Sequence, residues 1–375
     1  MLKKTVSSVG LLVLLILLSS HNEKKSDSHD DYIQKREQWV NAQFNSLSEE
    51  ERIGQLFMVA AYSNKNETHY QEIDKLVRDY KIGGLIFFQG GPMRESILTN
   101  RYQKLAKTPL LIGFDGEWGL AMRLDSTMKF PKQMTLGAIQ NDQLIVEMGE
   151  AIGEQCKRIG IHVNFAPVVD VNVNPKNPII GVRSFGEQKE LVARKGIAYM
   201  KGLQNVNVMA NAKHFPGHGD TESDSHHSLP VINHDMARID SVELYPFKQL
   251  FNDSLASIMV VHLQIPAIDN RNNVATTLSP KAVTKLLKNE MKFKGLIFTD
   301  ALNMKGVSAY YKPGEVDLLA FKAGNDVLLF AENVPRAISL FKEGIAKGEI
   351  DKRDIESRVK KILRAKYWVG LNKYK

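Results

Sequence analysis

The chain has 375 residues, of which 43% are hydrophobic and 25% are charged, as in soluble globular proteins with one large domain or two ordinary ones. Its net charge of +8 does not predict a nucleic-acid partner, because the basic residues are dispersed except at 281–294, and no aromatic-basic module accompanies them. The single cysteine, Cys156, excludes a disulfide framework, and we expect it to be a packing residue.

The N-terminus has the pattern of a secretory signal. Two lysines precede an apolar run at 9–18, and two serines follow it. This run is shorter than the roughly 20 residues that span a membrane, and His21 stands where a lipoprotein would need a cysteine. We therefore expect a signal at 1–20, a flexible polar leader at 21–35, and export to the periplasm or cell envelope.

The remainder of the chain, 36–375, alternates short apolar runs with amphipathic helical stretches. Such runs suit parallel strands that are buried on both faces. The candidate strands are 55–61, 83–88, 110–115, 162–170, 206–214, 257–266, 295–300 and 326–330. This number predicts an α/β fold, a single (β/α)8 TIM-type barrel, which needs roughly 250 residues. A doubly wound sheet is the alternative, but no Gly-rich nucleotide turn follows the first strand.

Ionisable side chains lie at or just beyond the ends of these strands. They are Asp115, Glu117 and Arg123 after the third strand, Asp170 in the fourth, Lys213 and His214 at the end of the fifth, His262 in the sixth, and Asp300 at the end of the seventh. In a barrel these ends face one cavity, and burying an unpaired charge costs several kcal/mol, so we expect a shared polar site. Helix capping by Asp170 or Asp300, and an interior position for His262, are the alternatives.

The segment after the fifth strand, 213–230, reads KHFPGHGDTESDSHHSLP. Gly217 and Gly219 permit tight turns and a close approach of the backbone to a ligand. Asp224 precedes His226 by two residues, a spacing at which the carboxylate can orient the imidazole and raise its pKa. Such a pair can act as a general acid near neutral pH.

With these motifs in place, the chain resembles the family 3 glycoside hydrolases, in particular the β-N-acetylglucosaminidases of the peptidoglycan-recycling type. The resemblance covers about 46–330. Its strongest parts are KHFPGHGDT with DSH, RSFG at 183–186 and TDAL at 299–302, supported by FAPVVDVN at 165–172 and FPKQMTLGA at 130–138.

The resemblance implies a retaining hydrolase that needs neither a metal nor another cofactor, with a small carbohydrate as its partner and a monomer as the default state. Asp300 would be the nucleophile, His226 the acid/base and Asp224 its partner. The residues implied to hold the N-acetylglucosamine ring are Asp115, Arg123, Arg183, Lys213 and His214. The family's DQEGG is DGEWG here, so Trp118 is expected either to offer a sugar-facing ring or to pack.

Three alternatives stay open. Phosphate could replace water as the acceptor, since a neutral imidazole does not repel an anion. A metal-dependent barrel hydrolase is suggested by the number of histidines, although the first strand offers no metal-binding H-x-H. A sugar-binding protein without catalysis would need neither Asp300 nor the DSH motif.

Overall fold

The computed structural model describes residues 29–225 and 229–374. The expected signal, and residues 21–28 of the expected leader, lie outside this part of the chain. Residues 29–46 are helical, which differs from a flexible leader that extends to residue 35. The reason is tertiary: Tyr32 stacks edge-on against Tyr367, with 5.5 Å between ring centroids, and Glu37 accepts two hydrogen bonds from Arg364. Contacts with the far end of the chain cannot be read from local composition.

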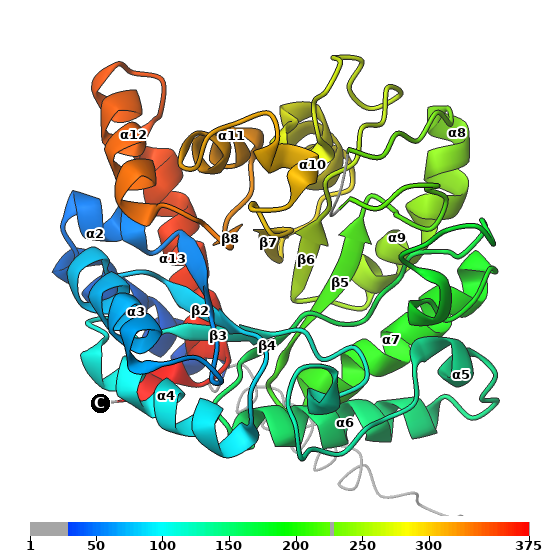
Figure 1. Ribbon diagram of the computed structural model, residues 1–375, viewed down its shortest axis with the longest axis horizontal. Coiled ribbons are helices and arrows are strands. Elements are labelled where there is room, and N and C mark those ends of the chain that lie inside the picture. The colour runs from blue at the N-terminus through cyan, green and yellow to red at the C-terminus, as the bar shows by residue number, and fades with distance from the viewer. Residues whose placement is uncertain (1–28, 226–228, 375) are drawn as a thin grey trace, which may run out of the picture.

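The core is a closed barrel of eight parallel strands, with helices around it (Figure 1). The strands are β1 (Phe57–Ala61), β2 (Gly84–Phe87), β3 (Leu111–Phe114), β4 (Val163–Asn164), β5 (Met209–Phe215), β6 (Ser257–Val260), β7 (Leu296–Thr299) and β8 (Leu328–Leu329). Neighbours in the chain are neighbours in the sheet, and β1 pairs with β8. A parallel bridge between Phe298 and Val327 joins β7 to the start of β8. This closure confirms the predicted (β/α)8 barrel and excludes the open doubly wound sheet.

The helices cover the outside of the strands (Figure 1). The longer ones are α3 (Glu67–Tyr80), α4 (Pro92–Leu105), α6 (Gln143–Arg158), α7 (Lys189–Asn205), α9 (Tyr245–Asn252), α11 (Glu315–Ala323), α12 (Val334–Ala346) and α13 (Lys352–Trp368), with a π-helix, η5, at Lys281–Glu290. Shorter elements are α2 (Glu49–Gly54), η1 (Leu120–Met122), α5 (Gln133–Gly137), η2 (Gly181–Arg183), α8 (Met236–Arg238), η3 (Ile239–Glu243), η4 (Thr276–Leu278), α10 (Lys305–Ser308) and η6 (Leu371–Lys373). Across the described ranges, no helix is long and apolar enough to cross a membrane.

The fourth and sixth strands are much shorter than predicted. β4 ends at Asn164, although the apolar pattern continues to Asp170, because Pro167 has no N–H for the ladder. Val168 still forms a parallel bridge with Lys213 of β5, but its own backbone groups pair with the side-chain amide of Gln133, which donates to the Val168 carbonyl (2.7 Å) and accepts from the Val168 N–H (3.0 Å). Asp170 is therefore carried by an irregular segment instead of a strand end.

β6 ends at Val260 because side chains take over the roles of strand partners. The hydroxyl of Thr277 donates to the carbonyl of Val261 at 2.7 Å, and the hydroxyl of Thr276 donates to the same carbonyl. The chain beyond β6 thus leaves the sheet without leaving these backbone groups unpaired. His262 follows in this irregular stretch.

Candidate active site

A cavity of about 260 Å³ opens at the carboxyl ends of the strands. Six of the eight residues predicted for the site line it: Asp115, Arg123, Arg183, Lys213, His214 and Asp300. The other polar lining residues are Glu117, His218 and Ser225, and the apolar part is formed by Ile86, Phe88, Met122, Ile179, Met259, Ala301 and Leu329. The lining mixes buried charges with apolar walls, as expected of a site for a small polar ligand.

Asp115, directly after β3, is held between two cations. One carboxylate oxygen lies 2.8 Å from a guanidinium nitrogen of Arg123, and the other lies 2.9 Å from the ammonium of Lys213. Burial would raise the pKa of Asp115, but Lys213 and Arg123 outweigh it and hold this pKa at about 2. The carboxylate is therefore ionised at physiological pH and can accept hydrogen bonds from a ligand's hydroxyl groups.

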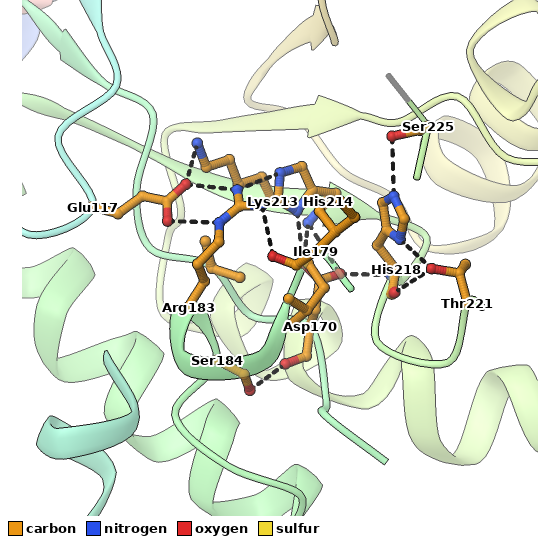
Figure 2. A network of polar contacts seen from close by, with 12 residues as sticks. Glu117, Asp170, Ile179, Arg183, Ser184, Lys213, His214, His218, Thr221 and Ser225 are labelled. Atoms are coloured by element: carbon orange, nitrogen blue, oxygen red, sulfur yellow. Dashed lines mark hydrogen bonds and ion pairs between the residues drawn. The ribbon is translucent and has the colours of Figure 1, made fainter. Parts of the chain in front are cut away.

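Glu117, which also lines the cavity, is a fully buried carboxylate whose partners are drawn in Figure 2. Arg183, at the end of η2, binds it through two nitrogens at 2.7 and 2.9 Å, and Lys213 approaches it to 2.9 Å. Burial opposes ionisation, but Arg183 and Lys213 keep the pKa of Glu117 below its ordinary value. Glu117 is one of the strand-end groups expected to share a polar site, but the resemblance assigns it no role. Its place two residues after Asp115 was the available signal.

Asp170 orients His214, the last residue but one of β5. Its carboxylate accepts hydrogen bonds from the ring Nδ1 of His214 (2.7 Å) and from the backbone N–H of the same residue (3.2 Å) (Figure 2). Arg183 lies 3.2 Å from the other ring nitrogen. Because a guanidinium only donates, Nε2 of His214 is the acceptor and Nδ1 carries the proton given to Asp170. Asp170, which sequence reasoning left open as a helix cap, is instead a buried support of the site.

Asp300 follows β7 and lines the same cavity. One carboxylate oxygen accepts the backbone N–H of Ala301 at 2.8 Å. Burial works against its charge, but His262, His214 and this N–H lower the pKa of Asp300 below 3.8. His262 is buried, with Nδ1 2.8 Å from the hydroxyl of Thr277 and Nε2 3.0 Å from the carbonyl of Ala301. The interior position considered for His262 is confirmed, and it lies beside the Asp300 turn.

The DSH motif reaches the cavity through its middle residue. Ser225 is 2% exposed and lines the cavity, while Asp224 is half-buried and is not among the lining residues. His226 lies outside the described residues. Gly219 packs against the chain's own backbone, because a Cβ there would stand 1.9 Å from the carbonyl oxygen of Val171.

Trp118 does not line the cavity. Its ring is half-buried, and the ammonium of Lys132 lies 5.1 Å from its centroid. The next residue, Gly119, has φ +81° and would place a Cβ 2.6 Å from the Phe130 ring, so the loop retains its need for glycine there. The packing alternative for Trp118 therefore fits the structure better than a sugar-facing ring.

The histidines and carboxylates of the described ranges are not arranged as metal ligands. Within 29–225 and 229–374, no group of three or more His, Cys, Asp or Glu side chains is placed to hold a metal ion. The carboxylates of the cavity are instead paired with Arg123, Arg183 and Lys213.

The profile of the "Glycosyl hydrolase family 3 N terminal domain" matches residues 48–365. The chain belongs to this family. Among curated family 3 relatives, the beta-hexosaminidase A of Pseudoalteromonas piscicida is 37% identical over 281 residues, which are 69% of this chain and 47% of that protein. The beta-hexosaminidase of Nitrosomonas eutropha is 33% identical over 269 residues, 69% of this chain and 76% of that protein.

Solved family 3 structures share the barrel. That of a glycoside hydrolase family 3 beta-N-acetylglucosaminidase from Paenibacillus sp. superposes with a TM-score of 0.81 at 34% identity, and the match covers 87% of this chain and 63% of that chain. The chain thus spans about half the length of the Pseudoalteromonas relative and under two thirds of the Paenibacillus protein.

Proposed function

We propose that this family 3 chain is a retaining β-N-acetylglucosaminidase that removes terminal β-linked N-acetylglucosamine from peptidoglycan fragments or related glycans. The observation that carries the proposal is the ionised carboxylate of Asp300 in a cavity whose other wall is the buried cluster of Asp115, Lys213 and Arg183. Relatives named as beta-hexosaminidases and a beta-N-acetylglucosaminidase support the choice of sugar.

The chemistry follows from the division of the cavity into a binding side and a reacting side. Asp115, Arg123, Lys213, Arg183 and His214 hold the sugar hydroxyls and the N-acetyl group in the proposal. Asp300 attacks the anomeric carbon and forms a glycosyl-enzyme through an oxocarbenium-like transition state. A low pKa suits this role, because only the ionised carboxylate is a nucleophile.

His226 acts as the acid and then the base in this scheme. It protonates the departing oxygen during the first step and removes a proton from the incoming water during the second. Asp224 orients and polarises the imidazole. Support comes from Ser225, which precedes His226 and lines the cavity together with Asp300.

The peptidoglycan substrate and the cellular location are further parts of the proposal. The apolar run at 9–18 with its preceding lysines is the pattern of an exported protein, and the periplasm or cell envelope is where peptidoglycan fragments arise. We expect the protein to act there as a monomer without a cofactor.

The test is the hydrolysis of 4-nitrophenyl N-acetyl-β-glucosaminide by separate variants. Asp300→Asn should lower kcat/KM by more than about a thousandfold, and His226→Ala by about a hundredfold or more. Asp224→Ala should cost less than His226→Ala, because Asp224 only orients the imidazole. Asp240→Asn, at a residue exposed on η3, is the matched control and should keep full activity. Wild-type turnover in both the Asp300 and His226 variants would refute the assignment.

The same assay separates hydrolysis from phosphorolysis. With chitobiose as substrate, we expect free N-acetylglucosamine at a rate that added phosphate does not raise. Accumulation of N-acetylglucosamine 1-phosphate would instead identify a phosphorylase.

A further inference from the structure

We propose that a hydrogen bond between His218 and Ser225 positions the acid/base residue, His226, relative to the nucleophile Asp300. We call this hydrogen-bonded pair the latch. The inference deepens the proposed function and rests on it. His218 and Ser225 are described residues, 1% and 2% exposed, and both line the cavity. Nε2 of His218 lies 3.1 Å from Oγ of Ser225, within hydrogen-bond distance (Figure 2).

The hydrogen bonds around Thr221 fix the tautomer of His218. The Thr221 hydroxyl donates to the carbonyl of His218 at 3.2 Å, so its oxygen is left to accept, and it lies 2.7 Å from Nδ1 of His218. Nδ1 therefore carries the ring proton, and Nε2 is the acceptor for the Ser225 hydroxyl. Burial, together with the neighbouring His214, lowers the pKa of His218 to about 4, which keeps this imidazole neutral.

The His218 side of the latch is anchored to the sugar-binding wall. Asp170, which orients His214, also accepts the backbone N–H of His218 at 2.7 Å. Asn177 donates to the carbonyl of His218 at 2.8 Å and to the hydroxyl of Thr221 at 3.2 Å. His218 is thus fixed at its N–H, its carbonyl and one ring nitrogen before it meets Ser225.

The Ser225 side is anchored to the helix that follows Asp300. The carbonyl of Ser225 accepts the backbone N–H of Gly306, in α10, which is the helix that follows β7 and Asp300 (3.2 Å). Ser225 therefore has one contact to His218, in the cavity lining, and one to the helix that follows Asp300. His226 is the next residue in the sequence. The two hydrogen bonds of Ser225 therefore fix the point, relative to Asp300, from which the chain continues to His226. Misplacement of a proton donor by about 1 Å can cost about a hundredfold in rate.

A positioning role predicts an effect that depends on the leaving group. A poor leaving group such as the second sugar of chitobiose needs protonation, whereas a dinitrophenolate departs without it. We expect Ser225→Ala to lower kcat/KM for chitobiose by about tenfold or more and for the dinitrophenyl glycoside by less than about twofold. Ser225→Thr, which keeps the hydroxyl, should restore most of the chitobiose activity.

Two controls keep the result interpretable. Ser308→Ala removes a hydroxyl from α10 that donates to the carbonyl of Asn303 (3.0 Å), and it should leave kcat/KM unchanged for both chitobiose and the dinitrophenyl glycoside. Azide, which attacks the glycosyl-enzyme without a general base, should accelerate dinitrophenyl turnover by Ser225→Ala more than by wild type.

Equal losses for both substrates in Ser225→Ala, or no loss for either, would overturn the latch. These outcomes leave the proposed function standing as long as the wild-type enzyme cleaves chitobiose. Failure of the wild type to cleave either substrate would overturn the proposed function itself.

Discussion

Arg183 and Glu117 form a buried, two-bonded ion pair, with nitrogen–oxygen distances of 2.7 and 2.9 Å and a Glu117 side chain that is fully buried. The two residues are 66 positions apart in the sequence, so the pair ties the loop after β3 to η2. This pair shapes one wall of the cavity and gives the first prediction.

Glu117→Gln should destabilise the protein strongly, because Arg183 would lose its paired carboxylate and Lys213 would keep only Asp115 as a counter-charge. Removing one partner of a buried pair typically costs about 3–5 kcal/mol, so we expect a loss of about 3 kcal/mol in the free energy of unfolding, measured by urea denaturation. Asp125→Asn is the control, since the Arg94–Asp125 pair is 55% and 59% exposed and should contribute less than about 1 kcal/mol. Equal effects of the two variants would contradict the role of Glu117.

Asp170→Asn should impair substrate binding through His214. The Asp170 carboxylate accepts hydrogen bonds from Nδ1 of His214 and from the backbone N–H groups of His214 and His218. The asparagine amide has only one accepting oxygen and cannot accept all of these hydrogen bonds. A charge-assisted hydrogen bond contributes about 2 kcal/mol, so kcat/KM for the nitrophenyl substrate should fall about thirtyfold. Asp253→Asn, at a residue paired with Lys201 on the surface, should leave kcat/KM unchanged. A fall of similar size in both variants would remove the link to His214.

The pH profile of kcat/KM should have its acidic limb below pH 3.8. The pKa of Asp300 is lowered because His262, His214 and the Ala301 N–H together outweigh the effect of burial, so the proposed nucleophile stays ionised down to lower pH than an ordinary aspartate. Activity is then lost only as the pH falls through this depressed pKa. The measurement is initial rates from pH 3 to 8 with a check of folding at each pH. An acidic limb near pH 5 or above in the folded enzyme would show that Asp300 is not the group whose ionisation sets this limb.

Glu95, in α4, should make the protein less stable as the pH rises. Both of its carboxylate oxygens are buried and have no hydrogen-bond partner among the described residues. Burial raises the pKa of Glu95 from 4.5 to about 8. The contribution of Glu95 to the free energy of unfolding is therefore fully present below pH 4.5 and is lost as the pH rises to about 8. This is a change of roughly 5 kcal/mol, at about 1.36 kcal/mol per pH unit.

Glu95→Gln removes this titration and keeps the side-chain shape. We expect the melting temperature of Glu95→Gln to exceed that of the wild type at pH 8 and the difference to shrink towards pH 5. Scanning calorimetry at several pH values measures it. A difference that does not depend on pH would show that Glu95 does not titrate in this range.

Much of the fold and part of the site were predictable because they depend on local pattern. Apolar runs place Asp115, Lys213 and Asp300 at strand ends, and the parallel barrel then brings the three to one cavity. The lengths of the strands were not predictable where distant residues intervene. Gln133, 35 residues before Val168, pairs with the Val168 backbone groups that the apolar pattern alone would place in a continued ladder.

The supporting roles of Glu117 and Asp170 were not predictable, for one physical reason. Glu117 and Asp170 act through partners far away in the sequence, 66 residues for the Arg183 pair and 44 for the His214 pair. Locally, Asp170 has the pattern of a helix cap, and Glu117 that of a loop residue. Only the closed barrel shows that both carboxylates are enclosed and support the residues that were predicted.

The most direct test of the account is to trap the glycosyl-enzyme. A fluorinated N-acetylglucosaminyl fluoride that reacts quickly and hydrolyses slowly should add one sugar mass to the intact protein, and peptide mapping should place the label on Asp300. Asp300→Asn should take up no label, while Asp240→Asn should be labelled like the wild type. A label on any other residue, or turnover of the reagent with no covalent adduct at any time, would contradict Asp300 as the nucleophile.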